Sequence, residues 1–194
     1  QALALLHDDR YRYFKQEAAE IVSYLLSHLE ITTTPLGPEV LPCIELYGCY
    51  TREEIFTLLG RQTEKSRMSG SVSGAFNLPE YDATLLFVTL NKSDKDFSPS
   101  TQYDDYVINK DYFHWQSKNT DSHHNRGGRI YTEQPQRHNK IVLFVREEKK
   151  DGFGNTCPFH CFGLVNYVSS HGDFPMNITW KLEKPVMPQY LKVV

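Results

Sequence analysis

The sequence predicts an α+β protein, in which N-terminal helices precede a mostly antiparallel, barrel-like β domain. Two patterns carry this prediction. Apolar residues recur at three- and four-residue spacing near the N-terminus, and short segments rich in β-branched and aromatic residues follow from about residue 83. With 194 residues and 40% hydrophobic content, the chain can form a folded core, which excludes wholesale disorder.

Two helices are expected first. Residues 11–30 favour the first helix, because their apolar positions recur at helical spacing: Tyr13, Phe14, Ala18, Ile21, Leu25 and Leu29. The second covers about 51–60, where Thr51 and Glu54 match a capping box and Gly60 ends the helix. Between them, "TTTPLGPEVLP" is rich in proline. We therefore expect a helical segment of a larger chain at 1–34, a proline-rich linker at 35–43 and a β-rich domain at 44–194.

Six or seven strands are expected beyond the polar loop "RQTEKSRMSGSVSG". They are separated by Gly, Pro, Asn and Asp, and they cover 83–90, 105–109, 112–117, 129–133, 140–147, 160–168 and 176–182. Apolar runs such as "IVLFV" are typical of strands that are buried on both faces or closed into a barrel.

Charge and cysteine spacing restrict the function. The net charge of −3 and the pI of about 6.3 mean that any nucleic-acid contact needs a local basic patch. No apolar run approaches the ~18 residues of a membrane span, and no signal peptide is present, so we expect a cytoplasmic protein without a membrane partner. The cysteine spacing is not that of structural zinc, which predicts buried or half-buried free thiols at Cys43, Cys49, Cys157 and Cys161.

An unusual group of rings, acids and amides lies in "TQYDDYVINKDYFHWQ". A flipped base needs rings on its faces and polar partners on its Watson–Crick edge, which predicts a base pocket made of Tyr103, Asp104, Asp105, Tyr106, Trp115 and Gln116. The tyrosines and Trp115 would stack, an aspartate would accept from N4 of cytosine, and Gln116 would pair with the O2/N3 edge. The alternative is that Phe113 and Trp115 are ordinary core residues.

Cations flank this group in an otherwise acidic chain. We expect phosphate contacts from Lys92, Lys95, Lys118, Arg126 and Arg129. The alternative for each is a solvated surface charge.

Three other patterns are weaker. Asp82 with Glu147 and Lys149 matches a Mg²⁺-dependent nuclease, although "EEKKDGFGN" is also typical of a solvated hairpin tip. A metal site at His123, His124 and His138 competes with a surface loop. "SGSVSG" lacks the ending of a phosphate-binding loop. We therefore assign no catalytic residue, metal ligand or cofactor to this chain.

Long blocks also resemble a known family. They are "LYGCYTREEIFTLLG", "LLFVTLNKSDKDFSPSTQYDDYVINKDYFHWQSKN", "GGRIYTEQ", "KIVLFVREEKKDGFG" and "CFGLVNYVSSHGDFPMNITWKLEKPVMP". In this order they are similar, over about 44–190, to a domain of formerly unknown function at the C-terminus of bacterial superfamily II helicases of the DEAD/DEAH type. In those proteins the domain often follows a phospholipase-D-like nuclease and the helicase motor.

The resemblance implies a function. The family's nearest characterised relatives are type IV restriction enzymes, which cut DNA containing methylated or hydroxymethylated cytosine. In those enzymes the C-terminal part is a specificity domain similar to the SET-and-RING-associated fold. It thus implies a non-catalytic module that binds double-stranded DNA with modified cytosine, beside helicase and nuclease domains of the same polypeptide. The alternatives are a protein-interaction domain that docks on the motor and a nuclease.

Overall fold

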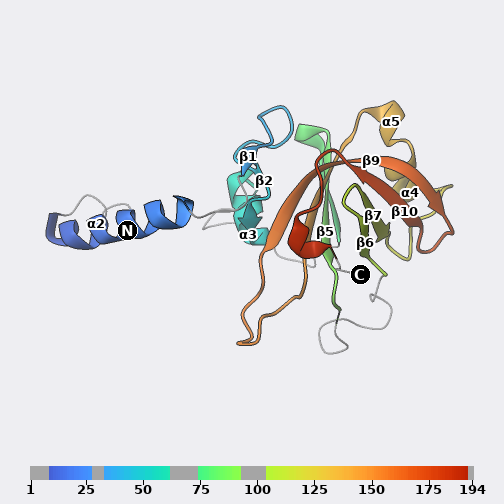
Figure 1. Ribbon diagram of the computed structural model, residues 1–194. Helices are drawn as coiled ribbons and strands as arrows, with labels where there is room; N and C mark the ends of the chain where they lie inside the picture. Colours follow the sequence, from blue (N-terminus) through green and yellow to red (C-terminus); the bar gives the residue numbers. More distant parts are fainter. Residues whose placement is uncertain (1–8, 28–32, 62–73, 93–103, 192–194) are drawn as a thin grey trace. The chain divides into compact units, whose positions relative to one another are not determined.

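The computed structural model describes residues 9–27, 33–61, 74–92 and 104–191, which belong to two compact units, 1–32 and 33–194 (Figure 1). The first unit contains the 3-10 turn η1 (Asp9–Tyr11) and the helix α2 (Arg12–Ser27). This agrees with the helix predicted at 11–30, whose last residues lie outside the described part. None of the helices in the described part is long and apolar enough to cross a bilayer.

The second unit is built on one eight-stranded sheet, so the predicted α+β class is confirmed. Its strands are β3 (Cys49–Tyr50), β4 (Ala75–Leu78), β5 (Ala83–Thr89), β6 (Tyr106–Asn109), β7 (Tyr112–Gln116), β8 (Lys140–Arg146), β9 (Phe159–His171) and β10 (Asn177–Leu182). The order is β4-β5-β8-β9-β10-β7-β6, and β3 also pairs with β9. Every pairing is antiparallel except that of β5 with β8.

The predicted barrel is wrong, because the sheet does not close. Within the described residues, β4 and β6 end the strand order and do not pair with each other. The sheet still curves along the long strand β9 (Figure 1), which pairs with β8 through its first half and with β10 through its second half. A left-handed glycine, Gly163 with φ of +78°, lies where the pairing with β8 shifts register, and such bulges bend a strand.

The segment predicted as a linker, 35–43, lies in the second unit. The two-residue strands β1 (Thr34–Pro35) and β2 (Glu45–Leu46) pair, and Leu41 between them is fully buried. The helix α3 (Arg52–Leu58) follows, with the predicted capping box at Thr51 and Glu54. Short 3-10 turns, η2 (Pro79–Tyr81) and η4 (Pro188–Tyr190), complete this unit together with two helices described next.

The predicted strand at 129–133 is wrong, because these residues are helical. They lie in α4 (Arg126–Thr132), which leads into the short α5 (Gln134–Arg137). The side chain of Asn125 caps α4 by accepting from the Gly128 N–H at 3.0 Å. A side chain at position 128 would come within 2.0 Å of the Ser122 carbonyl, so glycine is required there. Local capping and packing thus override the β-forming sequence "RIYT".

The apolar core follows the sequence pattern more closely. All residues of β5 are buried, and so are all of β8 except the half-buried Lys140. Around this parallel pair, Phe87 contacts the rings of Phe144 and Phe159 at centroid distances of 5.3 Å. The run "IVLFV" is therefore buried on both faces, as its lack of alternation predicts.

Candidate functional site

A cavity of about 330 Å³ opens beside β6, where β5 and β8 end. Its volume lies in the ~300–1,000 Å³ range of small-molecule sites. The residues that line it are Leu90, Asn91, Asp104, Asp105, Tyr106, Val107, Glu147, Gln189, Tyr190 and Leu191. The structure thus brings together three members of the predicted base pocket, Asp104, Asp105 and Tyr106. It adds Glu147 and Tyr190, which come from segments that the sequence pattern does not connect to them.

A buried ion pair shapes one wall of the cavity. Lys92 Nζ lies 2.7 Å from Asp105 Oδ2, and the two side chains are only 8% and 4% exposed. Asp105 Oδ1 accepts from the Gln116 N–H at 2.8 Å. Burial raises the pKa of Asp105, and the Lys92 ammonium and the Gln116 N–H partly offset that effect. Because both carboxylate oxygens already have partners, Asp105 joins the end of β5 to the start of β6 rather than facing a ligand.

Gln116 also has a structural role. Its Oε1 accepts from the Asp104 N–H at 2.7 Å, and its Nε2 donates to Asn177 Oδ1 at 2.9 Å. These bonds occupy the amide edge that was predicted to read a base. They hold the backbone of Asp104 at the cavity, where its carboxylate is exposed.

Tyr106 presents a ring at the mouth of the cavity. It is 42% exposed, and one of its faces stacks on His114 with a centroid distance of 4.6 Å and an interplanar angle of 12°. His114 Nδ1 lies 2.7 Å from the Asp104 carbonyl oxygen, which can only accept, so Nδ1 carries a proton. The His114 ring, held by this hydrogen bond, therefore fixes the orientation of the exposed Tyr106 ring.

Trp115 does not belong to this site. It pairs with Ile178 across the sheet, whereas Gln116 pairs with Asn177, so the two side chains lie on opposite faces. Trp115 is 3% exposed and packs edge-on against Tyr131 at 5.0 Å. The prediction that it stacks on a base is therefore wrong, because the core covers its faces. Tyr103 lies outside the described residues.

Those of the predicted phosphate-binding cations that the structure describes do not form one patch. Lys95 lies outside the described residues, Lys92 is buried in its ion pair, and Lys118 is half-buried. Arg129 pairs with Glu133 at 2.5 Å.

Arg126 lines a different cavity, of about 340 Å³, together with Asp82. Asp82 and Leu90 flank opposite ends of β5, whose seven residues span ~23 Å. Arg126 is thus remote from the cavity beside β6.

The same geometry excludes the nuclease constellation. Strands β5 and β8 run parallel and in step, from Ala83 opposite Lys140 to Thr89 opposite Arg146. Asp82 precedes one strand and Glu147 follows the other, so they are separated by at least the ~23 Å length of the strands and cannot hold the same ion.

Glu147 and Lys149 instead begin the β8–β9 hairpin, which extends beyond the sheet (Figure 1). The carboxylate of Asp151 accepts from the N–H groups of Phe153 and Asn155, at 2.9 and 2.8 Å, which shapes the tip. Phe153 at this tip is 94% exposed. The sequence signal for it was an aromatic residue between the turn glycines Gly152 and Gly154. Glu147, the first residue of the hairpin, lines the cavity, so the hairpin begins at the edge of the cavity.

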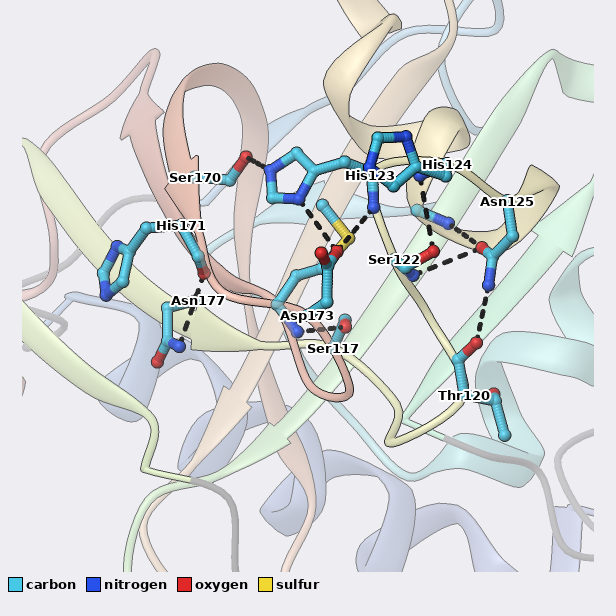
Figure 2. A network of polar contacts seen from close by, with 12 residues as sticks. Ser117, Thr120, Ser122, His123, His124, Asn125, Ser170, His171, Asp173 and Asn177 are labelled. Atoms are coloured by element: carbon cyan, nitrogen blue, oxygen red, sulfur yellow. Dashed lines mark hydrogen bonds and ion pairs between the residues drawn. The ribbon is translucent and has the colours of Figure 1, made fainter.

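The histidines do not converge on a metal. His123 donates or accepts at both ring nitrogens, towards Asp173 and Ser170, while the His124 ring is exposed (Figure 2). His138 ends α5 in a left-handed conformation. Within the described residues no three metal-ligating side chains come together. All four cysteines are free thiols, but Cys43 and Cys49 are exposed rather than buried.

Comparison with known proteins gives one family. No curated protein matches the sequence. Residues 44–193 match the family model described as a domain of unknown function, DUF3427. The match includes the cavity, the hairpin and every strand from β2 to β10. Because it covers most of the chain, this protein belongs to the DUF3427 family.

Proposed function

We propose that this chain is a non-catalytic DNA-recognition domain that binds double-stranded DNA and reads methylated or hydroxymethylated cytosine by flipping the base. Its parent would be a superfamily II helicase with a phospholipase-D-like nuclease, as in type IV restriction enzymes, to which the sequence blocks are similar. The curved sheet would then be a relative of the SET-and-RING-associated fold. One observation carries the proposal: the cavity places the exposed ring of Tyr106 beside the exposed carboxylate of Asp104, at the edge of a protruding hairpin.

The chemistry of the cavity suits a cytosine rather than a phosphate. The N4 amino group of cytosine donates hydrogen bonds, and the acids at the cavity, Asp104 and Glu147, can accept them. A phosphate would be repelled by the same acids. Tyr106 supplies one face for stacking, and the apolar side chains of Leu90 and Val107 can receive a C5 substituent. Gln116 and His114 hold Asp104 and Tyr106 in position, and Asp105 in turn accepts from the Gln116 N–H.

The hairpin supplies a complementary element. A base that leaves the duplex opens a gap in the stack, and exposed apolar side chains commonly insert at such steps. Phe153 stands at a tip that is already ordered by Asp151, and Lys149 and Lys150 precede the tip. These lysines are not among the five cations that the sequence predicts to contact phosphate. The hairpin therefore has the composition of a wedge with flanking phosphate contacts.

Removing the ring of Tyr106 should weaken binding to methylated duplex about tenfold or more, because a stacked base is worth ~1–3 kcal/mol. Tyr106→Phe keeps the ring and should bind like the wild type. Affinities of the 194-residue chain are measured by fluorescence anisotropy on matched methylated and unmethylated duplexes.

A second pair of variants tests the carboxylate. Asp104→Asn should lose preference for the methylated duplex, whereas Asp82→Asn, with the same charge change at the other end of β5, should not. Equal affinity of the wild type for both duplexes would refute the proposal.

Phe153→Ala should reduce flipping without unfolding the domain, because this side chain contacts solvent almost entirely. We expect a loss of binding of about tenfold, from the same stacking contribution of ~1–3 kcal/mol per ring. The fluorescence of 2-aminopurine placed next to the methylated cytosine reports the flip. Phe153→Trp is the matched control, since it keeps an aromatic wedge. If Phe153→Ala gives the same fluorescence change as the wild type, the hairpin does not take part in base flipping.

A protein-interaction domain is the alternative function. Among the described strands β6 ends the sheet, and Tyr106 and Ile108 on it are 42% and 45% exposed. Such an edge can pair with a strand of another domain. That function predicts affinity for the helicase motor supplied in trans, with no effect of DNA methylation on the melting temperature of this chain.

A further inference from the structure

A row of hydrogen bonds joins Ser170, His123 and Asp173 (Figure 2). Ser170 lies near the end of β9, His123 lies in the loop between β7 and α4, and Asp173 lies in the turn between β9 and β10. His123 Nε2 is 2.7 Å from Ser170 Oγ, and His123 Nδ1 is 2.9 Å from Asp173 Oδ1. A hydroxyl, an imidazole and a carboxylate in this order form the arrangement of a nucleophile, its base and the group that orients the base.

The electrostatics give each group a definite role. Asp173 Oδ1 also accepts from the backbone N–H of His123 at 2.7 Å, and these bonds from His123 lower the pKa of Asp173. The carboxylate is therefore ionised at neutral pH and can only accept, so Nδ1 of His123 carries the proton. This leaves the lone pair of Nε2 directed at Ser170 Oγ.

A fourth group completes the row. The hydroxyl of Tyr167 lies 2.7 Å from Ser170 Oγ. If Tyr167 donates to Oγ, the Ser170 proton points to His123, which is the orientation that a general base requires. Tyr167 also packs edge-on against the buried Trp180, so its position is fixed by the core.

The row is accessible to a substrate. The side chains of His123 and Asp173 are 33% and 34% exposed, and Ser170 is half-buried. Phe174, next to Asp173, is 59% exposed and offers an apolar contact for an acyl or aryl group.

We propose that Ser170 is a nucleophile that attacks activated acyl esters, with His123 as its general base and Asp173 as the residue that positions His123. Ser170 Oγ forms a bond to the carbonyl carbon while its proton passes to His123 Nε2. The bond from that carbon to the leaving oxygen breaks, and the leaving oxygen takes the proton from His123. Water, deprotonated by His123, then attacks the acyl-serine and releases the carboxylic acid and free Ser170. This activity is additional to the DNA-reading function proposed above, which uses the cavity beside β6 and itself involves no covalent step.

Reaction with a fluorophosphonate probe tests the proposal, because the neighbouring serine is an internal control. Ser169 pairs with Thr179 and Ser170 with Ile178, so the two hydroxyls lie on opposite faces of the same strand. Peptide mass spectrometry of the labelled wild-type chain should find the probe on Ser170, at a rate at least ~100-fold above that of Ser169, as expected for general-base assistance. Labelling of Ser170 no faster than Ser169 would overturn the proposal, and this comparison needs no variant.

Variants then assign the roles. His123→Ala should reduce the Ser170 labelling rate by ~100-fold, and Asp173→Asn should reduce it as well, while Ser169→Ala leaves it unchanged. Hydrolysis of p-nitrophenyl acetate should fall in Ser170→Ala and persist in Ser169→Ala. A His123→Ala chain that melts like the wild type and still labels Ser170 at the wild-type rate would equally overturn the proposal.

Discussion

Replacing Lys92 by methionine is expected to lower the free energy of unfolding by ~3–5 kcal/mol at neutral pH or above, because it leaves the buried carboxylate of Asp105 without its counter-ion. The two side chains are 8% and 4% exposed, and their 2.7 Å contact joins the end of β5 to the start of β6. Urea unfolding followed by circular dichroism measures the loss. Lys150→Met, an exposed change of the same type on the hairpin, should alter stability by less than ~0.5 kcal/mol.

The loss should depend on pH with a definite sign. Burial already raises the pKa of Asp105, and removing the ammonium of Lys92 raises it further. In Lys92→Met the folded state then binds a proton at higher pH than the unfolded state does. Its free energy of unfolding is therefore highest below the unfolded pKa and falls as pH rises through the folded pKa. The difference between wild type and variant should shrink as the solution is acidified.

The double variant Lys92→Met/Asp105→Leu is the matched control, since replacing both members of a buried ion pair by apolar groups is often neutral. It should lose the pH dependence and recover the stability apart from the ~1–3 kcal/mol that the Gln116 N–H costs without its acceptor. A deficit of Lys92→Met that is the same in acid and in alkali would contradict the role assigned to Asp105.

Trp115→Ala should lower the free energy of unfolding by ~3–5 kcal/mol, the usual cost of removing a large buried ring. Trp115 packs against Tyr131 and lies 6.4 Å, between ring centroids, from Trp180. Its loss opens a cavity between the sheet and α4. Thermal and urea unfolding measure the effect, and Trp115→Phe should recover part of it.

Comparing Trp115→Ala with Tyr106→Ala distinguishes a residue of the core from a residue of the binding site. Tyr106 is 42% exposed, so its removal should change stability little while it weakens DNA binding. Trp115→Ala should do the reverse under conditions where the variant remains folded. If Trp115→Ala kept the wild-type stability but lost its DNA affinity, Trp115 would be part of the binding site after all.

The sequence alone determined those elements whose structure depends on interactions between residues close together in the chain. The capping box of Thr51 and Glu54 forms within four residues, so α3 was predictable. In "YFHWQ" the alternation of a strand puts Phe113 and Trp115 on one face and His114 and Gln116 on the other, but it does not indicate which face a ligand could reach. The unbroken apolar run of β8 correctly indicated burial on both faces.

Propensity failed where contacts from elsewhere in the fold compete with it. "RIYTE" has the residues of a strand, yet Asn125 caps it as a helix and Tyr131 of that helix packs on Trp115 of the sheet. The expected barrel failed for a related reason. Closure requires a pairing between the first and last strands of the sheet, and no local pattern encodes that pairing.

Only the tertiary structure decided which residues form the candidate sites. The sequence placed Asp105 in a base pocket, but its partner Lys92 comes from the end of another strand and makes the pair structural. Glu147 and Tyr190 reach the cavity from distant segments, and His123 meets Ser170 across 47 positions of the chain. Periodicity and capping act over a few residues, whereas these contacts depend on how the bulged strand β9 curves the whole sheet.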